Sequence, residues 1–172
     1  MQKRTVKRLI TGLLVVLTAY FFIIFIHGWW SDWQPAEGAS PLEITQTSTQ
    51  TIVKDSILHI ATWNVGYGGL GAESDFFYDD EGMWYSGGSM IRSPRPLVEK
   101  NLKGALEFLK NTRADFFLLQ ETDLESDRSY RIRQYEDYEK TLPGFAATFA
   151  ENFKCDRVPI PLLEPWHPYG KT

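Results

Sequence analysis

Residues 57–65, ILHIATWNV, and residues 114–121, ADFFLLQE, are two short apolar runs that each end at a polar side chain, Asn64 in the first and Glu121 in the second. A Gly-rich segment and a stretch with helical periodicity separate the two runs. A strand, a crossover helix and a second strand form a βαβ unit, and its right-handed crossover makes the strands parallel. Asn64 and Glu121 are therefore predicted to lie at the same edge of one sheet.

The stretch between the runs predicts an amphipathic helix over about residues 97–111, because apolar residues recur there at helical spacing. These residues are Val98, Leu102, Ala105, Leu106 and Leu109. Residues of both parities in the first run are largely apolar, so we expect its strand to be covered on two faces. His59 is predicted to be partly buried on the Trp63 side, away from Asn64.

The polar residues that end the two runs are candidates for a metal site. Open α/β sheets bind ligands at the carboxyl ends of their strands. A carboxylate that follows an apolar run needs a partner, and a hard cation bound by carboxylate, amide and water oxygens is one such partner. The alternative is that Glu121 marks the point where the strand reaches solvent and Asn64 opens a turn. Gln120 is expected to give hydrogen-bonding support.

The segments IATWNVG (60–66) and ADFFLLQETD (114–123) resemble the endonuclease/exonuclease/phosphatase family. These metal-dependent phosphoesterases include secreted deoxyribonucleases, apurinic endonucleases, inositol phosphatases and sphingomyelinases. The resemblance implies catalytic roles for Asn64 and Glu121, with Glu121 as a Mg²⁺ (or Mn²⁺) ligand and Asn64 close to the metal and the phosphate. It also implies the first part of a four-layer α/β sandwich over residues 57–172. The family's later Asp-x-Asn and Asp-His motifs do not occur in the sequence.

The N-terminal part predicts a membrane anchor. Residues 9–26, LITGLLVVLTAYFFIIFI, are uncharged, and as a helix they span about 27 Å, close to the ~30 Å hydrocarbon core of a bilayer. A single transmembrane helix is therefore predicted over residues 9–27. The basic residues in 1–8 place the N-terminus in the cytoplasm and the rest of the chain outside. A cleaved signal peptide is the alternative, but three tryptophans follow the run where small residues are usual.

Charge limits the class of partner. The net charge is −4, and the first eight residues contribute +4, so the remainder carries −8. An acidic body argues against a stable nucleic-acid partner, although a metal site can still act on phosphate. The predicted substrates are therefore phosphate esters, namely lipid head groups, nucleotides or nucleic acid. The single cysteine, Cys155, excludes an internal disulfide and is expected to be a small apolar filler.

The remaining segments are predicted as follows. Residues 28–56 read as a linker, in which Ile52 and Val53 favour an edge strand. Residues 66–96 form a long loop whose glycines would let backbone amides approach a phosphate. Ser126 or Asp127 caps a helix that runs to about residue 138. A third strand over residues 145–152 follows, and the Pro-rich tail after it has no long regular element.

Two side chains beyond the runs are predicted to contact substrate. Arg128 lies in the segment that follows Glu121, and Asn152 ends the third predicted strand at the same edge. The chain is thus expected to be the anchored, extracytoplasmic N-terminal portion of a phosphoesterase. A non-catalytic, membrane-tethered binding module is the alternative. A third hypothesis is a small enzyme in which Asp79, Asp80 and Glu121 hold the metal.

Overall fold

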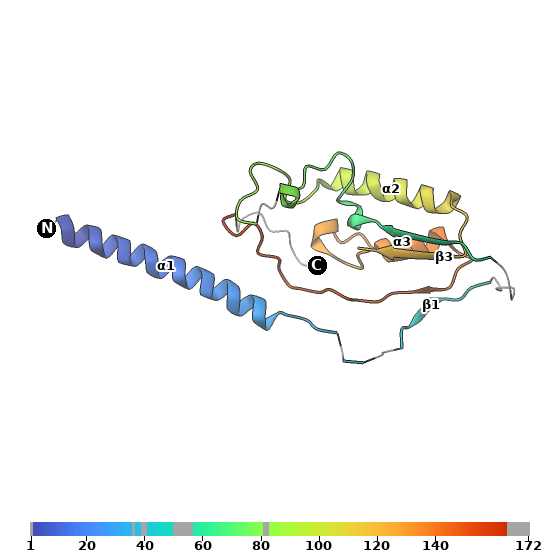
Figure 1. The fold of residues 1–172 in the computed structure, drawn as a ribbon, viewed down its shortest axis with the longest axis horizontal. Helices are drawn as coiled ribbons and strands as arrows, with labels where there is room; N and C mark the ends of the chain where they lie inside the picture. Colours follow the sequence, from blue (N-terminus) through green and yellow to red (C-terminus); the bar gives the residue numbers. More distant parts are fainter. Residues whose placement is uncertain (1, 36, 39–40, 50–56, 81–82, 165–172) are drawn as a thin grey trace. The chain divides into compact units, whose positions relative to one another are not determined.

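The computed structural model describes residues 2–35, 37–38, 41–49, 57–80 and 83–164. The chain divides into two compact units, Met1–Trp33 and Gln34–Thr172. The first unit holds one long helix, and the second combines helices with two small sheets (Figure 1). The prediction of a mixed helix and strand chain with an N-terminal apolar helix is confirmed.

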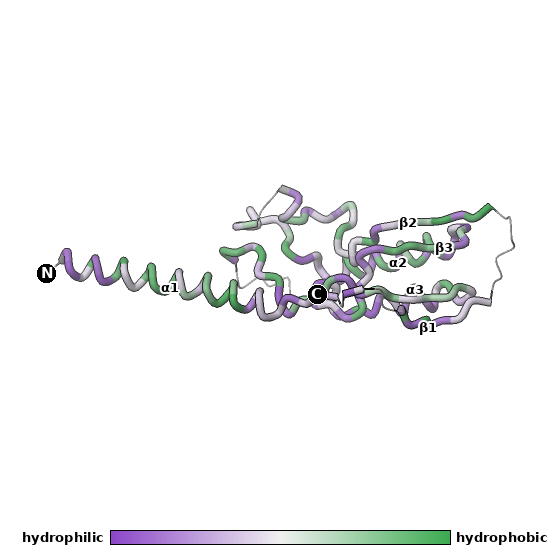
Figure 2. The backbone as a smooth tube through the Cα atoms, turned by 60° about the horizontal axis from the view of Figure 1, so that its bottom comes forward, coloured by the Kyte–Doolittle hydropathy of each residue, from purple (hydrophilic) through white to green (hydrophobic). Residues whose placement is uncertain are grey.

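Helix α1 spans Gln2–Trp30 and contains the predicted span 9–27. Its first turns are hydrophilic and the following turns are apolar (Figure 2). Its apolar side chains face outward, with Leu9 69% and Phe25 73% exposed. None of the residues in the apolar stretch of the helix is buried inside the protein. A helix of this length and composition is sufficient to cross a membrane or to act as a signal anchor.

The second unit is built on a βαβ unit. Strand β2 (Ile60–Asn64) pairs in parallel with strand β3 (Phe116–Gln120), and helix α2 (Arg95–Asn111) connects them. The register pairs Ile60 with Phe116 and Asn64 with Gln120, so the two strands end level with each other. This arrangement confirms the predicted strand, helix and strand order, and the helix ends at Asn111 as predicted.

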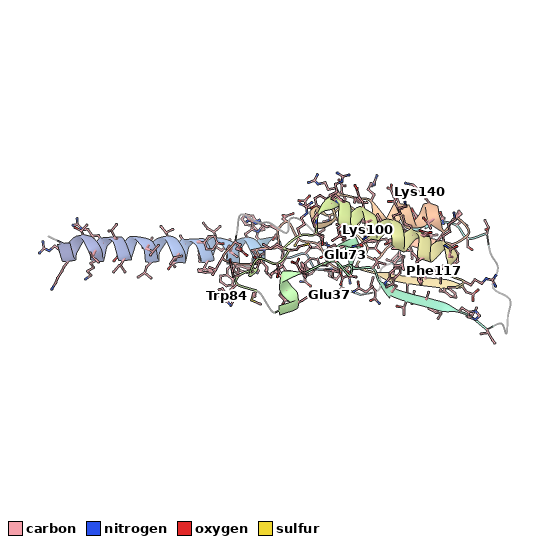
Figure 3. All side chains as sticks on the ribbon, turned by 90° about the horizontal axis from the view of Figure 1, so that it is seen from above. Glu37, Glu73, Trp84, Lys100, Phe117 and Lys140 are labelled. Carbon is pink, nitrogen blue, oxygen red and sulfur yellow. The ribbon has the colours of Figure 1, made fainter. Side chains whose placement is uncertain are left out.

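Helices α2 and α3 (Gln134–Thr141) form the core with one face of this sheet. Leu102 and Leu109 of α2 pack with Tyr138 of α3, and partly buried sheet residues cover the cluster. Phe117, labelled in Figure 3, is one of these, and its ring also meets the ring of Phe145 at 5.2 Å. The predicted apolar stripe of α2 is therefore the buried face of that helix.

The opposite face of the sheet is exposed, so the prediction that the first strand is covered on two faces is wrong. Ile60 is 62% and Leu118 53% exposed. The reason is that both packed helices contribute to one cluster on the Phe117 and Leu119 side, and no described segment covers the other side. His59 is likewise exposed instead of partly buried, with its Nδ1 3.5 Å from Asp115 Oδ2.

A second, antiparallel sheet joins the predicted linker to the predicted third strand. Strand β1 (Ile44–Gln46) pairs with β4 (Ala147–Thr148), with a register shift between Ile44 and Gln46. The predicted linker thus contributes a strand. The expected strand over 145–152 shortens to two residues because its short, bulged partner cannot extend the pairing. The expected edge strand at Ile52 and Val53 lies outside the described residues.

The segments that flank the sheet edge are more ordered than predicted. The expected helix from Ser126 is split into a 3₁₀ turn, η3 (Asp127–Ser129), and α3, because Tyr130 and Arg131 both adopt positive φ. The long loop contains two 3₁₀ turns, η1 (Gly66–Gly68) and η2 (Phe77–Asp80), and a β-bridge between Phe76 and Met90.

The core tyrosine predicts a loss of stability at alkaline pH. Burial, with smaller contributions from Asp137 and Asp123, raises the pKa of the Tyr138 hydroxyl to about 12 from 10.0. Because the folded protein holds this proton more tightly, stability is fully present below pH 10 and is lost as the pH rises toward 12. We expect urea unfolding to show a loss of about 2–3 kcal/mol across this window. Tyr138→Phe should remove this component, and an unchanged pH profile in the variant contradicts the assignment.

Candidate active site

Asn64 and Glu121 meet at the carboxyl ends of the two parallel strands. Asn64 Nδ2 donates a hydrogen bond of 2.8 Å to Glu121 Oε1. The Gly66 amide donates to Asn64 Oδ1 at 2.8 Å, which fixes the orientation of the Asn64 side chain. The structure thus brings together the two site residues predicted from the sequence, although 57 positions separate them.

Glu121 has an unusual backbone for a residue with a large side chain. Its φ is +55°, in the left-handed region that costs a non-glycine residue about 1–2 kcal/mol. Two main-chain bonds hold it: Val65 N donates to Gln120 O and Tyr67 N donates to Glu121 O, both at 2.9 Å. The loop after β2 is therefore tied to the loop after β3 at the position where the carboxylate projects. The predicted support from the Gln120 side chain stays a prediction.

The glycines of the loop after β2 shape the turn, and their amides are already used. Gly68 has φ +71°, and an added Cβ would approach Val98 O to 3.2 Å. The amides of Gly66, Gly68 and Gly69 donate to Asn64 Oδ1, Val65 O and Gly66 O respectively. For these three amides the expected approach to a phosphate is not supported, because each already donates a hydrogen bond within the turn.

Arg128 is held by a carboxylate instead of facing an open site. Its Nη2 lies 2.8 Å from Asp123 Oδ1, and its Nε donates to both oxygens of Asp123 at 3.2 and 3.1 Å. Its guanidinium carbon also lies 4.1 Å from the ring centre of Tyr67. Its role in substrate contact stays a prediction. Asn152 follows β4 in an irregular, exposed segment, and its role stays a prediction as well.

The residues present would give Mg²⁺ or Mn²⁺ few protein ligands. Glu121 is exposed, and the bond from Asn64 engages one of its two oxygens. Within the described ranges, no group of three His, Cys, Asp or Glu side chains is placed to hold a metal. The hypothesis that Asp79, Asp80 and Glu121 hold a metal stays a prediction, because the side chain of Asp80 lies outside the described part. Mg²⁺ often takes one or two carboxylates and completes its shell with water and substrate phosphate.

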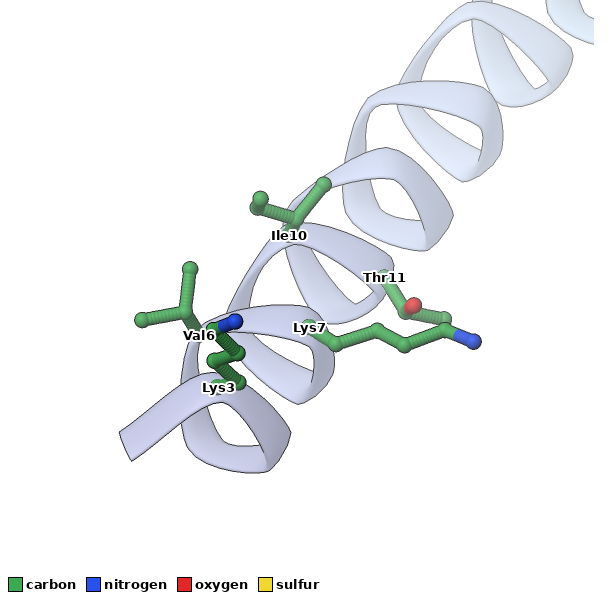
Figure 4. A pocket seen from close by; sticks show the side chains of 5 residues that line it. All are labelled: Lys3, Val6, Lys7, Ile10 and Thr11. Atoms are coloured by element: carbon green, nitrogen blue, oxygen red, sulfur yellow. The ribbon is translucent and has the colours of Figure 1, made fainter. Parts of the chain in front are cut away.

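Other charged groups near the loop are engaged structurally. The guanidinium carbon of Arg92 lies 3.6 Å from the centre of the Tyr130 ring, and Arg92 is only partly exposed. Arg95 pairs with Glu99. Lys100 pairs with Glu73, and both residues are labelled in Figure 3. A hollow elsewhere on the surface is lined by Lys3, Val6, Lys7, Ile10 and Thr11 of α1 alone (Figure 4). It belongs to the other unit and has no part in this site.

No pattern in the sequence indicates the buried residue that links the two loops of the site. Gln134 is fully buried, and its side chain bonds to Tyr67 and Asp123. These contacts join positions up to 67 residues apart, so no local spacing reveals them.

Neither family models, curated protein sequences nor solved structures give a match to the chain.

Proposed function

We propose that this chain is the N-terminal portion of a membrane-anchored, Mg²⁺-dependent phosphoesterase with a four-layer α/β sandwich fold. The hydrogen bond between Asn64 and Glu121 carries the proposal. It joins the two residues that the resemblance assigns to a metal site, and it lies where parallel sheets bind ligands. Helix α1 supports the anchored location. The basic residues in 1–8 favour an N-terminus in the cytoplasm and a domain outside.

In this proposal each residue has a separate task. Glu121 gives a carboxylate oxygen to the cation, and Asn64 orients that carboxylate through its Nδ2. The cation, when bound, would neutralise the phosphate and lower the pKa of a bound water. The family's later motifs would provide the general base, because the described residues form no group of three His, Cys, Asp or Glu side chains that could hold a metal and a base together at Glu121. The net charge of −8 outside the basic segment favours lipid head groups or nucleotides over tightly held nucleic acid.

The first test is cation binding by the full chain in detergent micelles, measured with Mn²⁺ by electron paramagnetic resonance. We expect Glu121→Gln to weaken Mn²⁺ binding by more than about tenfold, because the substitution replaces the carboxylate proposed to bind the cation with a neutral amide. Glu107→Gln is the matched control, since Glu107 is an exposed carboxylate on α2. Equal affinities in both variants and the unsubstituted chain overturn the proposal.

The uncovered sheet face favours a second candidate, a non-catalytic membrane-tethered binding module. Ile60, Phe116 and Leu118 expose an apolar surface on strands that each have one partner in the described part of the chain. Such surfaces and open strand edges are typical of protein interaction sites. The Mn²⁺ experiment separates the two candidates, because a binding module does not require a cation at Glu121.

A further inference from the structure

Gln134 is a fully buried polar residue that connects the two loops leaving β2 and β3. Its Nε2 donates to Tyr67 O at 2.6 Å, and its Oε1 accepts from Asp123 N at 3.3 Å. The loop after β2 therefore accepts a hydrogen bond from the amide nitrogen of Gln134, and the loop after β3 donates one to its amide oxygen. A side chain of the same size without both functions cannot make this bridge: methionine lacks both, and glutamate at neutral pH lacks the donor.

The bridge closes a ring of contacts around Glu121. Tyr67 is held at both ends, because its N–H donates to Glu121 O and its C=O accepts from Gln134. Asp123 lies two positions after Glu121 and is 6% exposed, with its amide on Gln134 and its carboxylate on Arg128. The guanidinium of Arg128 returns to the Tyr67 ring. Glu121 is thus held through its hydrogen bond from Tyr67 N and through the two-residue chain connection to Asp123.

This ring holds two residues in a costly conformation. Tyr67 has φ +43° and Glu121 has φ +55°, and neither is glycine. Left-handed residues of this kind persist where the surrounding contacts over-determine them. The position of the Glu121 carboxylate follows from that backbone conformation. Loosening the bridge therefore releases the conformation that points the carboxylate toward Asn64.

We infer that Gln134 is the positioning residue that fixes Glu121 for cation binding, an inference that rests on the proposed function. Gln134 touches neither Asn64 nor the Glu121 carboxylate by any hydrogen bond between described residues. It acts through the main chain of Tyr67 and of Asp123. A buried amide that only filled the core could be replaced by an apolar side chain of equal volume without changing the affinity of the site.

The test compares Gln134→Met and Gln134→Glu with the control Tyr138→Leu in the full chain in micelles. Tyr138 lies on the same helix and packs in the core with Leu102 and Leu109 of α2, without a hydrogen bond to the Gln134 side chain among the described contacts. Hydrogen exchange of the Tyr67 amide reports on the bridge, and Mn²⁺ affinity reports on the carboxylate. In both Gln134 variants we expect Tyr67 exchange to rise about tenfold relative to Leu119, and Mn²⁺ affinity to fall about 10–100-fold. Tyr138→Leu should lower the unfolding midpoint and leave the Mn²⁺ affinity unchanged.

Each outcome decides the inference. Unchanged Tyr67 exchange overturns the bridge, and faster exchange with unchanged Mn²⁺ affinity reduces Gln134 to a structural residue. Equal losses of Mn²⁺ affinity in Tyr138→Leu also overturn the inference, because general destabilisation would then explain them. If the unsubstituted chain binds no Mn²⁺, the proposed function fails, and the exchange measurement alone decides whether Gln134 orders Glu121. Gln134→Glu, which is nearly isosteric, serves if Gln134→Met does not fold.

Discussion

Arg128→Ala is expected to lower the free energy of unfolding by about 3–5 kcal/mol. The side chain of Arg128 is 17% exposed and that of its partner Asp123 is 6% exposed, with 2.8 Å between Nη2 and Oδ1. Removing the arginine leaves the Asp123 carboxylate buried without its counter-ion, which costs far more than the pair itself contributes. The variant also loses the stacking of the guanidinium on the Tyr67 ring.

Urea unfolding of the full chain in micelles, followed by circular dichroism, measures this effect. Arg131→Ala is the matched control, because Arg131 pairs with Asp127 at the same 2.8 Å but is 64% exposed. An exposed pair is screened by solvent, so the control should unfold close to the unsubstituted chain. Similar urea midpoints for Arg128→Ala and Arg131→Ala would show that burial of the Asp123 pair contributes little.

Local patterns in the sequence predict the elements of the βαβ unit well, because their apolar residues repeat at the period of the element. Val98, Leu102 and Leu109 mark the buried side of α2. The same patterns fail where tertiary contacts decide. Strand β4 keeps only two of the predicted residues because its partner β1 is short, and the alternation of residues 145–152 carries no information about that partner.

Of the site, the sequence predicts only the two residues at the strand ends, Asn64 and Glu121. Parallel strands that end level bring Asn64 and Glu121 to the same edge of the sheet, as the βαβ pattern predicts, and the structure adds the hydrogen bond between them. The positive φ of Glu121 and its bridge through Gln134 depend on loops that meet only in the folded chain. Gln134 also sits among polar helix residues, where nothing distinguishes a buried glutamine from an exposed one.

The core of the βαβ unit gives the second large effect. We expect Leu109→Ala to lower the free energy of unfolding by about 2–5 kcal/mol, because the substitution removes buried methyl groups and leaves a cavity. Leu109 is 1% exposed and packs with Leu102 and Tyr138 between the sheet and α3. A cavity there would lie against the partly buried Phe117 and Leu119 of β3. The measurement is again urea unfolding of the full chain in micelles.

Phe108→Ala tests whether this cost comes from burial or from apolar character alone. Phe108 precedes Leu109 on α2 but is 59% exposed, and its ring meets Trp63 edge-on at 5.2 Å. The control removes more carbon atoms than Leu109→Ala, yet most of them are already in water, so we expect it to cost about 1 kcal/mol or less. If Phe108→Ala lowers the free energy of unfolding as much as Leu109→Ala does, the side of α2 that carries Phe108 must be covered in solution. A core on only one face of the sheet would then be wrong.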